Sequence, residues 1–223
     1  MDLSKSYDFF QPEKIDCRIH IIGCGSVGST VAVMLAKAGV TKMTLWDFDV
    51  VESKNLANQM FRSIDIGTPK IEALANILEE INPDIRDNLK FKPEGWNGQL
   101  LSGFVFLCVD NIEIRRAIVE KHFDNENIRA MFDFRTGLEN AQHYAADWTD
   151  EKMRTDFLNS MSFSHEEAKE ETPMSACNVT LSVFPTVAVV CALGVANFMN
   201  FWNDKGIKKL ILSDSYKFTL DAF

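Results

Sequence analysis

The first fifty residues alternate between apolar runs and one amphipathic segment, in the order strand, helix, strand. Residues 18–22 and residues 42–46 form short apolar runs of the kind found in buried strands. Between them, apolar residues recur at helical spacing from Val31 to Ala38, and Gly39 is a suitable helix terminator. This order predicts a β-α-β unit with parallel strands and a right-handed connection.

The same alternation of strands and helices continues along the chain. A second helix is predicted to have Thr68 as its N-cap and Pro69 as its first residue, and to end at Asn82. The continuous apolar run at 104–109 indicates a strand that is covered on both faces. Further elements are expected at 114–118 (helix), 130–134 (strand), 142–148 (strand), 184–202 (helix), and 209–212 with 216–220 (closing hairpin).

The last third of the chain contains one polar and one uncharged segment. Residues 149–176 are rich in charged and hydroxyl side chains, which predicts an exposed crossover with one short helix. No charged residue lies between Asn178 and Asn203, a stretch long enough to span a bilayer, but Pro185 and several asparagines favour a buried core helix and no membrane association. The prediction is therefore one α/β domain over residues 1–223, Rossmann-like, with a mostly parallel sheet, helices on both faces and an antiparallel C-terminal portion.

Charge and cysteine content narrow the class of function. The chain has 23 Lys and Arg against 32 Asp and Glu, and this net charge of −9 argues against a nucleic-acid binder. Its five cysteines contain no C-x-x-C pair, so no zinc is expected. An odd number of scattered thiols, with no signal-peptide pattern at the start, favours a reducing, cytoplasmic location.

A glycine-rich turn lies between the first predicted strand and the first predicted helix. Gly23, Gly25 and Gly28 fit the pattern G-x-G-x-x-G, which combines a tight turn with close approach of the backbone to a phosphate. The helix that follows presents free N–H groups to that phosphate. Asp47 ends the next predicted strand, where a carboxylate can hydrogen-bond ribose hydroxyls. These features predict a bound nucleotide, but a dehydrogenase would show them too.

Motifs beyond the glycines discriminate between nucleotides. The chain reads D-F-D-V-V-E at 47–52, N-L-A-N-Q at 55–59, D-I-G-T-P-K at 65–70 and D-N at 110–111. As an ordered set, these motifs resemble the ThiF/MoeB/ubiquitin-activating family over nearly the whole chain. The resemblance implies an enzyme that uses ATP to adenylate the C-terminal glycine of a ubiquitin-like protein.

Two residues fit this chemistry on physical grounds as well. Lys70, near the start of a helix, could place an ammonium beside the triphosphate. Asp110 follows a buried strand, at the crevice where such sheets bind ligands, and its carboxylate suits Mg²⁺. An alternative role for Asp110 is to cap the next helix.

The resemblance assigns further residues to the nucleotide. It implies that Asp47 holds the ribose and that Asn55 and Gln59 line the nucleotide pocket near the phosphates. Asp49 and Asn111 complete the candidate set, and a turn cap is the alternative role for Asp49.

The sequence departs from the family pattern at several points. Many members carry Arg where this chain has Asn58, and our hypothesis is that Arg62, on the same face if the segment is helical, replaces it. Cys177 resembles in position the family cysteine that receives the activated carrier, with a buried packing cysteine as the alternative. The start of the chain has no R-x-x-R-Q pattern of the kind that contributes to the partner subunit's site, although a homodimer is expected by analogy.

The leading hypothesis is an enzyme that converts ATP and a carrier carboxylate into an acyl-adenylate and pyrophosphate, with ATP and Mg²⁺ as cofactors. Its expected partner is a small ubiquitin-like or sulfur-carrier protein ending in glycine, with thiol capture on Cys177 as a further step. Three alternatives stay open: adenylation of a peptide or modified-tRNA carboxylate, a catalytically inactive ThiF-like partner that binds a ubiquitin-like protein, and an NAD-dependent oxidoreductase. Asn58 favours the inactive partner, whereas an oxidoreductase would leave Lys70 and Asp110 without a role.

Overall fold

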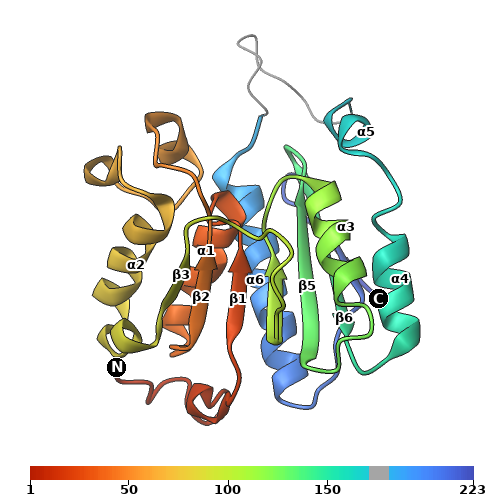
Figure 1. Ribbon diagram of the computed structural model, residues 1–223, viewed down its shortest axis with the longest axis horizontal. Coiled ribbons are helices and arrows are strands. Elements are labelled where there is room, and N and C mark those ends of the chain that lie inside the picture. Colours follow the sequence, from red (N-terminus) through yellow and green to blue (C-terminus); the bar gives the residue numbers. More distant parts are fainter. Residues whose placement is uncertain (171–180) are drawn as a thin grey trace.

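The computed structural model describes residues 1–170 and 181–223, which form an eight-stranded sheet with helices on both faces (Figure 1). Its strand order is β3-β2-β1-β4-β5-β6-β7-β8. The strands are β1 (Ile19–Ile22), β2 (Met43–Trp46), β3 (Lys90–Lys92), β4 (Gly103–Leu107), β5 (Ile128–Thr136), β6 (Asn140–Asp147), β7 (Leu210–Asp214) and β8 (Thr219–Ala222). The α-helices are α1 (Ser26–Lys37), α2 (Lys70–Ile81), α3 (Ile112–Lys121), α4 (Glu151–Asn159), α5 (His165–Glu170) and α6 (Phe184–Trp202).

The sheet is parallel in one half and antiparallel in the other. Strands β3, β2, β1, β4 and β5 pair in parallel, whereas β6, β7 and β8 follow β5 in antiparallel pairs. This confirms the predicted Rossmann-like class with an antiparallel C-terminal portion. Because β1 lies between β2 and β4, the loops that follow these three strands are neighbours at one edge of the sheet.

Alternate side chains of the parallel strands enter two separate cores. In β4, Phe104 and Phe106 join the core shared with α1, α2 and α6, while Val105 and Leu107 join the core shared with α3 and α4. Successive side chains of a strand point to opposite faces, so a strand covered on both faces is apolar throughout. The continuous apolar run in the sequence has this physical origin.

Helix α6 packs against α1 and against β5 and β6. Its length and composition alone would let it cross a membrane, but in this domain it contributes to the core. Phe198 makes edge contacts with the rings of Phe104 and Phe106. A Cβ at Gly194 would lie 2.1 Å from the ring of Phe134, so the close approach of α6 to the sheet requires glycine at this position.

One predicted helix boundary is wrong. Helix α2 begins at Lys70, with Pro69 rather than Thr68 at its N-cap position and no side chain in the described chain capping it. The carbonyl of Thr68 accepts the N–H of Val51 at 2.9 Å, and Val50 forms an antiparallel bridge with Pro69. This extended pairing places the start of the helix after Pro69.

The described part of the predicted crossover, residues 149–170, contains two helices, α4 and α5, instead of one. Met153 and Phe157, four residues apart on α4, are buried in the core that α4 shares with α3. The segment is therefore not exposed throughout, because one apolar stripe in a polar sequence anchors α4 to the sheet. Residues 171–176 of the predicted crossover lie outside the described residues.

Candidate active site

The glycine loop joins β1 to α1 and touches the loop that follows β4. Gly23 has a φ of +91°, in the left-handed region that favours glycine, and its N–H donates to the carbonyl of Trp46 at 2.8 Å. A Cβ at Gly23 would lie 2.8 Å from the nitrogen of Val109, and a Cβ at Gly28 would lie 1.8 Å from the carbonyl oxygen of Gly23. A Cβ at Gly25 would meet nothing within 4 Å. Close packing thus requires glycine at positions 23 and 28, whereas the space beside the Cα of Gly25 is open.

Asp47 fastens the loop after β2 to the glycine loop. The N–H of Cys24 donates to Asp47 Oδ2 at 2.6 Å, and the N–H of Asp49 donates to Asp47 Oδ1 at 2.8 Å. Gly25 is the N-cap of α1, and within the described residues no side chain caps this helix. The first N–H groups of a helix lack partners within the helix, so this end of α1 suits an anion. The contact of Asp47 with a ribose remains a prediction.

Lys70, the first residue of α2, is held at the same edge of the sheet. It is only 7% exposed, and its Nζ lies 2.7 Å from Asp49 Oδ2. The N–H of Lys70 also donates to the carbonyl of Asp49 at 2.9 Å. The Asp49 side chain is 51% exposed, so water can solvate its carboxylate when Lys70 turns to another anion. The motifs named both residues but did not predict this ion pair.

Asp110 and Asn111 follow β4 beside the glycine loop. Asn111 Oδ1 accepts the N–H groups of Glu113 and Ile114 at 2.8 and 3.2 Å, so Asn111 caps α3 and the capping role suggested for Asp110 is wrong. Asp110 is exposed.

Asp110 offers a single carboxylate, which suits magnesium bound together with a triphosphate. Within residues 1–170 and 181–223, no cluster of three or more His, Cys, Asp or Glu side chains could hold a metal by itself. Magnesium is commonly held by one or two carboxylates, with phosphate oxygens and water completing its shell. Asp110 fits that arrangement as the protein ligand.

Asn55 and Gln59 belong to the segment that follows Asp49. Asn55 is buried, and its Oδ1 closes a turn by accepting the N–H of Glu52 at 2.8 Å. The N–H of Met60 donates to Ser29 Oγ at 3.2 Å, which ties the segment to α1. Gln59 Oε1 is buried and has no hydrogen-bond partner in the described part of the chain. Since buried polar groups are normally paired, this orphaned atom fits a ligand that contacts Gln59.

Arg62 is paired with two carboxylates in this structure. Its guanidinium contacts Asp65 at 3.1 Å and Glu80 at 2.7 Å, and hydrogen bonds to these two carboxylates raise the pKa of Arg62. Glu80 comes ten residues after Lys70 in α2, about 15 Å along the helix axis. In this structure the Arg62 charge is paired with carboxylates near the far end of α2. Its replacement of the arginine missing at Asn58 stays a prediction.

Three of the five cysteines are packing residues. Cys24, Cys108 and Cys191 are buried, and burial raises the pKa of each thiol. The thiolate is the nucleophilic form, so none of these three is suited to capture an acyl group. Cys177, the candidate for that step, lies outside the described residues.

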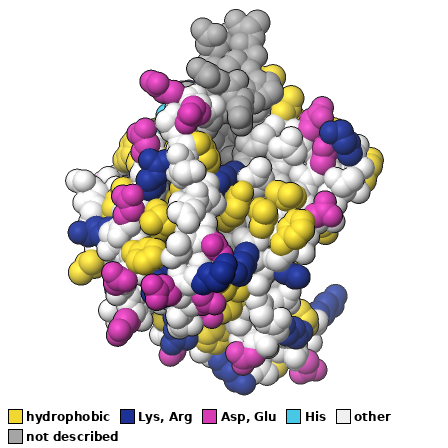
Figure 2. Space-filling model, turned by 90° about the vertical axis from the view of Figure 1, so that its right-hand side faces the viewer, with side chains coloured by type: hydrophobic (Ala, Val, Ile, Leu, Met, Phe, Trp, Pro, Cys, Tyr) yellow, Lys and Arg dark blue, Asp and Glu magenta, His cyan; other side chains and the backbone are white. Residues whose placement is uncertain are grey.

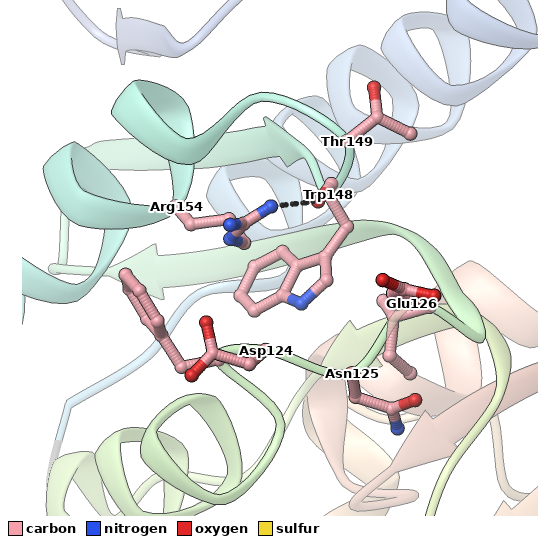
Figure 3. A pocket seen from close by; sticks show the side chains of 8 residues that line it. Asp124, Asn125, Glu126, Trp148, Thr149 and Arg154 are labelled. Atoms are coloured by element: carbon pink, nitrogen blue, oxygen red, sulfur yellow. Dashed lines mark hydrogen bonds between the residues drawn. The ribbon is translucent and has the colours of Figure 1, made fainter.

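A cavity of about 360 Å³ lies at the opposite end of the sheet (Figure 3). Ile128, which begins β5, and Trp148, which follows β6, both line it. Because β5 is parallel to β4, its N-terminal end points away from the edge that carries the glycine loop. Arg154 donates to the carbonyl of Trp148 at 2.6 Å, and Asp124 and Glu126 give the cavity wall the opposite charge. None of the predicted site residues that the structure describes lines this cavity.

The fold and the loops at its parallel edge define a nucleotide-binding domain of the Rossmann-like class. Residues 10–220 match the ThiF family, and the chain belongs to that family. Relatives include Ubiquitin-like modifier-activating enzyme 5 of Caenorhabditis briggsae, 36% identical over 118 residues, which cover 46% of this chain and 27% of the relative. The enzyme of the same name from Gallus gallus is 36% identical over 116 residues, covering 45% of this chain and 29% of the relative. The matched region is thus less than a third of each relative's length.

Solved structures share the fold at low sequence identity. Escherichia coli MccB, solved with ATP, superposes with a TM-score of 0.75 and 17% identity, over 97% of this chain and 66% of MccB. PaaA superposes with a TM-score of 0.72 and 14% identity, over 100% of this chain and 68% of PaaA. These likenesses confirm the architecture.

Two glycine substitutions separate the packing role of the loop from its role in nucleotide binding. Gly28→Ala is expected to destabilise the protein strongly, because its Cβ would meet a backbone oxygen at 1.8 Å. Gly25→Ala is expected to fold, since its Cβ would meet nothing within 4 Å. The added methyl would clash with an approaching phosphate and weaken the free energy of ATP binding by about 1–3 kcal/mol. The dissociation constant for ATP should therefore rise roughly tenfold or more. Thermal unfolding with and without ATP and Mg²⁺ measures both effects. Unchanged ATP affinity in Gly25→Ala would contradict the placement of the phosphates at this loop.

Proposed function

We propose that this chain is an ATP-dependent adenylating enzyme that activates the C-terminal carboxylate of a small ubiquitin-like or sulfur-carrier protein. The observation that carries the proposal is that the glycine loop and Asp110 follow β1 and β4 at one edge of the sheet, where Lys70, the first residue of α2, is held by Asp49 of the loop after β2. Contacts join all three: the glycine loop bonds Asp47, Lys70 pairs with Asp49, and Gly23 touches the backbone just before Asp110.

Charge neutralisation explains why adenylation needs these groups. Attack on the α-phosphate by a carboxylate brings two anions together, so catalysis depends mainly on positioning and on opposing the negative charge. The N-terminus of α1 and the Lys70 ammonium provide that opposition from the protein. Asp110 would hold Mg²⁺, which when bound neutralises phosphate oxygens and stabilises the departing pyrophosphate.

The carrier carboxylate is itself the nucleophile, so this chain need not supply a general base. One carboxylate oxygen forms a bond to the α-phosphorus, and the bond from that phosphorus to the bridging oxygen of pyrophosphate breaks. The products are the acyl-adenylate and pyrophosphate. Capture of the acyl group by the Cys177 thiol, with release of AMP, is a further part of the proposal.

The relatives and the charge distribution support a protein, and not a nucleic acid, as the substrate. The relatives are named as activating enzymes for a ubiquitin-like modifier, a small protein. Figure 2 shows a face on which Lys and Arg mix with Asp and Glu, with no continuous basic area on that face. A net charge of −9 also argues against binding of a nucleic-acid backbone. A cytoplasmic homodimer is part of the same proposal.

One specific observation favours a second candidate, an inactive ThiF-like partner that binds a ubiquitin-like protein. Asn58 stands where the family commonly has arginine, and the nearest arginine along the chain, Arg62, is committed to Asp65 and Glu80. This candidate predicts carrier binding without exchange of labelled pyrophosphate into ATP. The adenylating enzyme predicts both.

The nucleotide itself gives a simple test of the proposal. ATP with Mg²⁺ is expected to stabilise the folded protein by about 1–3 kcal/mol at concentrations well above its dissociation constant, because ligand binding to the native state stabilises it by mass action. NAD⁺ at the same concentration is expected to change the melting temperature little, because binding of NAD⁺ would leave Lys70 and Asp110 without a role. Differential scanning fluorimetry measures both. Stabilisation by NAD⁺ without any by ATP would instead support the oxidoreductase.

A further inference from the structure

Arg115 is a buried arginine of α3 that the motifs do not single out, and its guanidinium reaches the backbone next to Asp110. We infer that Arg115 is a positioning residue, which fixes the peptide between Val109 and Asp110 and thereby aims the Asp110 carboxylate. This inference rests on the proposed function, in which Asp110 binds Mg²⁺ together with ATP.

The geometry at Val109 is the first step. Arg115 Nε donates to the carbonyl oxygen of Val109 at 2.6 Å, and Nη2 donates to the same oxygen. This carbonyl belongs to the peptide that ends at Asp110. The other side of Val109 is closely packed, because a Cβ on Gly23 would lie 2.8 Å from the Val109 nitrogen. The Val109–Asp110 peptide is therefore held by the Arg115 fork, and the peptide before it packs against the glycine loop.

A second set of contacts fixes Arg115 itself. Its Nη1 donates to Asp133 Oδ1 at 2.5 Å and to the carbonyl of Phe134 at 2.6 Å. Asp133 is completely buried on β5, and Arg135 Nε donates to its other oxygen at 2.7 Å. Burial alone would raise the pKa of Asp133, but the charges of Arg115 and Arg135 outweigh burial and hold that pKa below its usual range. Asp133 is thus an ionised anchor that sets the position of the guanidinium.

The chain is also fixed on the other side of Asp110. The next residue, Asn111, accepts two backbone N–H groups of α3 and so begins the helix that carries Arg115. The residues on both sides of Asp110 are therefore tied to the same helix, while Asp110 itself is exposed. A metal ligand that is already held in its binding position needs less reorganisation when the metal binds. Residues that hold a metal ligand in position commonly affect the metal affinity.

Lysine cannot reproduce these contacts. The guanidinium is a planar fork whose separate N–H groups bond Val109 on one side and Asp133 on the other, whereas an ammonium is a compact point charge. Arg115→Lys keeps the charge that balances Asp133 but loses the simultaneous bonds. It is therefore expected to fold and to leave Asp110 less well aimed.

The adjacent Arg116 provides a matched control. It lies on the same helix, and its guanidinium also binds backbone carbonyls, those of Met161 and Phe163. These carbonyls follow α4, and none of the contacts of the Arg116 side chain involves the Val109–Asp110 peptide. Arg116→Lys makes the same chemical change without touching that peptide.

The test measures metal-dependent binding of ATP, a readout separate from catalysis. ATP is titrated into the full chain by calorimetry at a series of Mg²⁺ concentrations and once with EDTA. Arg115→Lys is expected to need about tenfold more Mg²⁺ than the wild type to reach half of the gain in ATP affinity that the metal provides. Metal-free ATP is expected to bind both proteins equally. Arg116→Lys is expected to match the wild type in both conditions.

The outcomes separate this inference from the proposed function. Equal Mg²⁺ requirements in Arg115→Lys and the wild type would overturn the inference and leave the function standing. A wild type whose ATP binding does not respond to Mg²⁺ would overturn both. If Arg115→Lys does not fold, Asp133→Asn takes its place, because it retains Arg115 and one acceptor oxygen while removing the anchoring charge. A wild-type Mg²⁺ requirement in a folded Asp133→Asn would then overturn the inference.

Discussion

Replacing Asp110 by asparagine is expected to lower ATP–pyrophosphate exchange by about 10²–10³-fold, measured with a ubiquitin-like acceptor that ends in Gly-Gly. The substitution preserves the size and removes the negative charge that would hold Mg²⁺ beside the triphosphate. Because the Asp110 side chain is exposed and Asn111 supplies the cap of α3, the free energy of unfolding should change by less than about 0.5 kcal/mol.

Glu113→Gln is the matched control for Asp110→Asn. Glu113 is an exposed acid in the first turn of the same helix, so its loss removes one charge from the same region. The control is expected to retain exchange within about twofold while losing up to ~1 kcal/mol of stability from the helix N-terminus. Equal exchange in Asp110→Asn and Glu113→Gln would show that Asp110 does not hold the metal.

Lys70→Met is expected to lower the same exchange rate by about 10²-fold. Methionine retains an apolar stem in the buried position but removes the ammonium, so the charge of the triphosphate is opposed less well. The unfolding free energy should fall by only about 1 kcal/mol, because the partner Asp49 is half exposed and water can solvate it. Chemical denaturation and exchange, measured on the same preparation, separate the two effects.

A second lysine pair provides the control for Lys70→Met. Lys54 Nζ lies 2.9 Å from Glu52 Oε2, and both side chains are more than half exposed. Lys54→Met removes an ammonium from the neighbouring segment and should leave the exchange rate unchanged. The role given to Lys70 would fail if both variants exchanged at the wild-type rate, or if Lys70→Met lost activity only in proportion to its unfolded fraction.

Much of the fold could be predicted from sequence because its signals are local. The apolar run that became β4 is buried on both faces, and the uncharged stretch that became α6 carries the residues that meet the sheet. The glycine pattern predicted the turn between β1 and α1, where Gly23 has a positive φ. Periodicity and turn chemistry act over a few residues, so one sequence suffices to find them.

The parts that could not be predicted depend on contacts between distant segments. The start of α2 follows from the pairing of residues 50–51 with residues 68–69. Arg62 pairs with Asp65 and Glu80. Glu80 lies 18 residues further along the chain, so local sequence patterns do not indicate this pair. Arg115 reaches Asp133 eighteen residues away and on another strand. Helical spacing suggested a face shared by residues 58 and 62, but that segment is not helical.

A crystal structure of the protein with a non-hydrolysable ATP analogue and Mg²⁺ would decide whether these loops bind the triphosphate. We expect the triphosphate against the glycine loop, the Lys70 ammonium within hydrogen-bond distance of its oxygens, and Mg²⁺ bound at the Asp110 carboxylate. Phosphates bound elsewhere, with Lys70 still paired only to Asp49 and no metal on Asp110, would rule out this site.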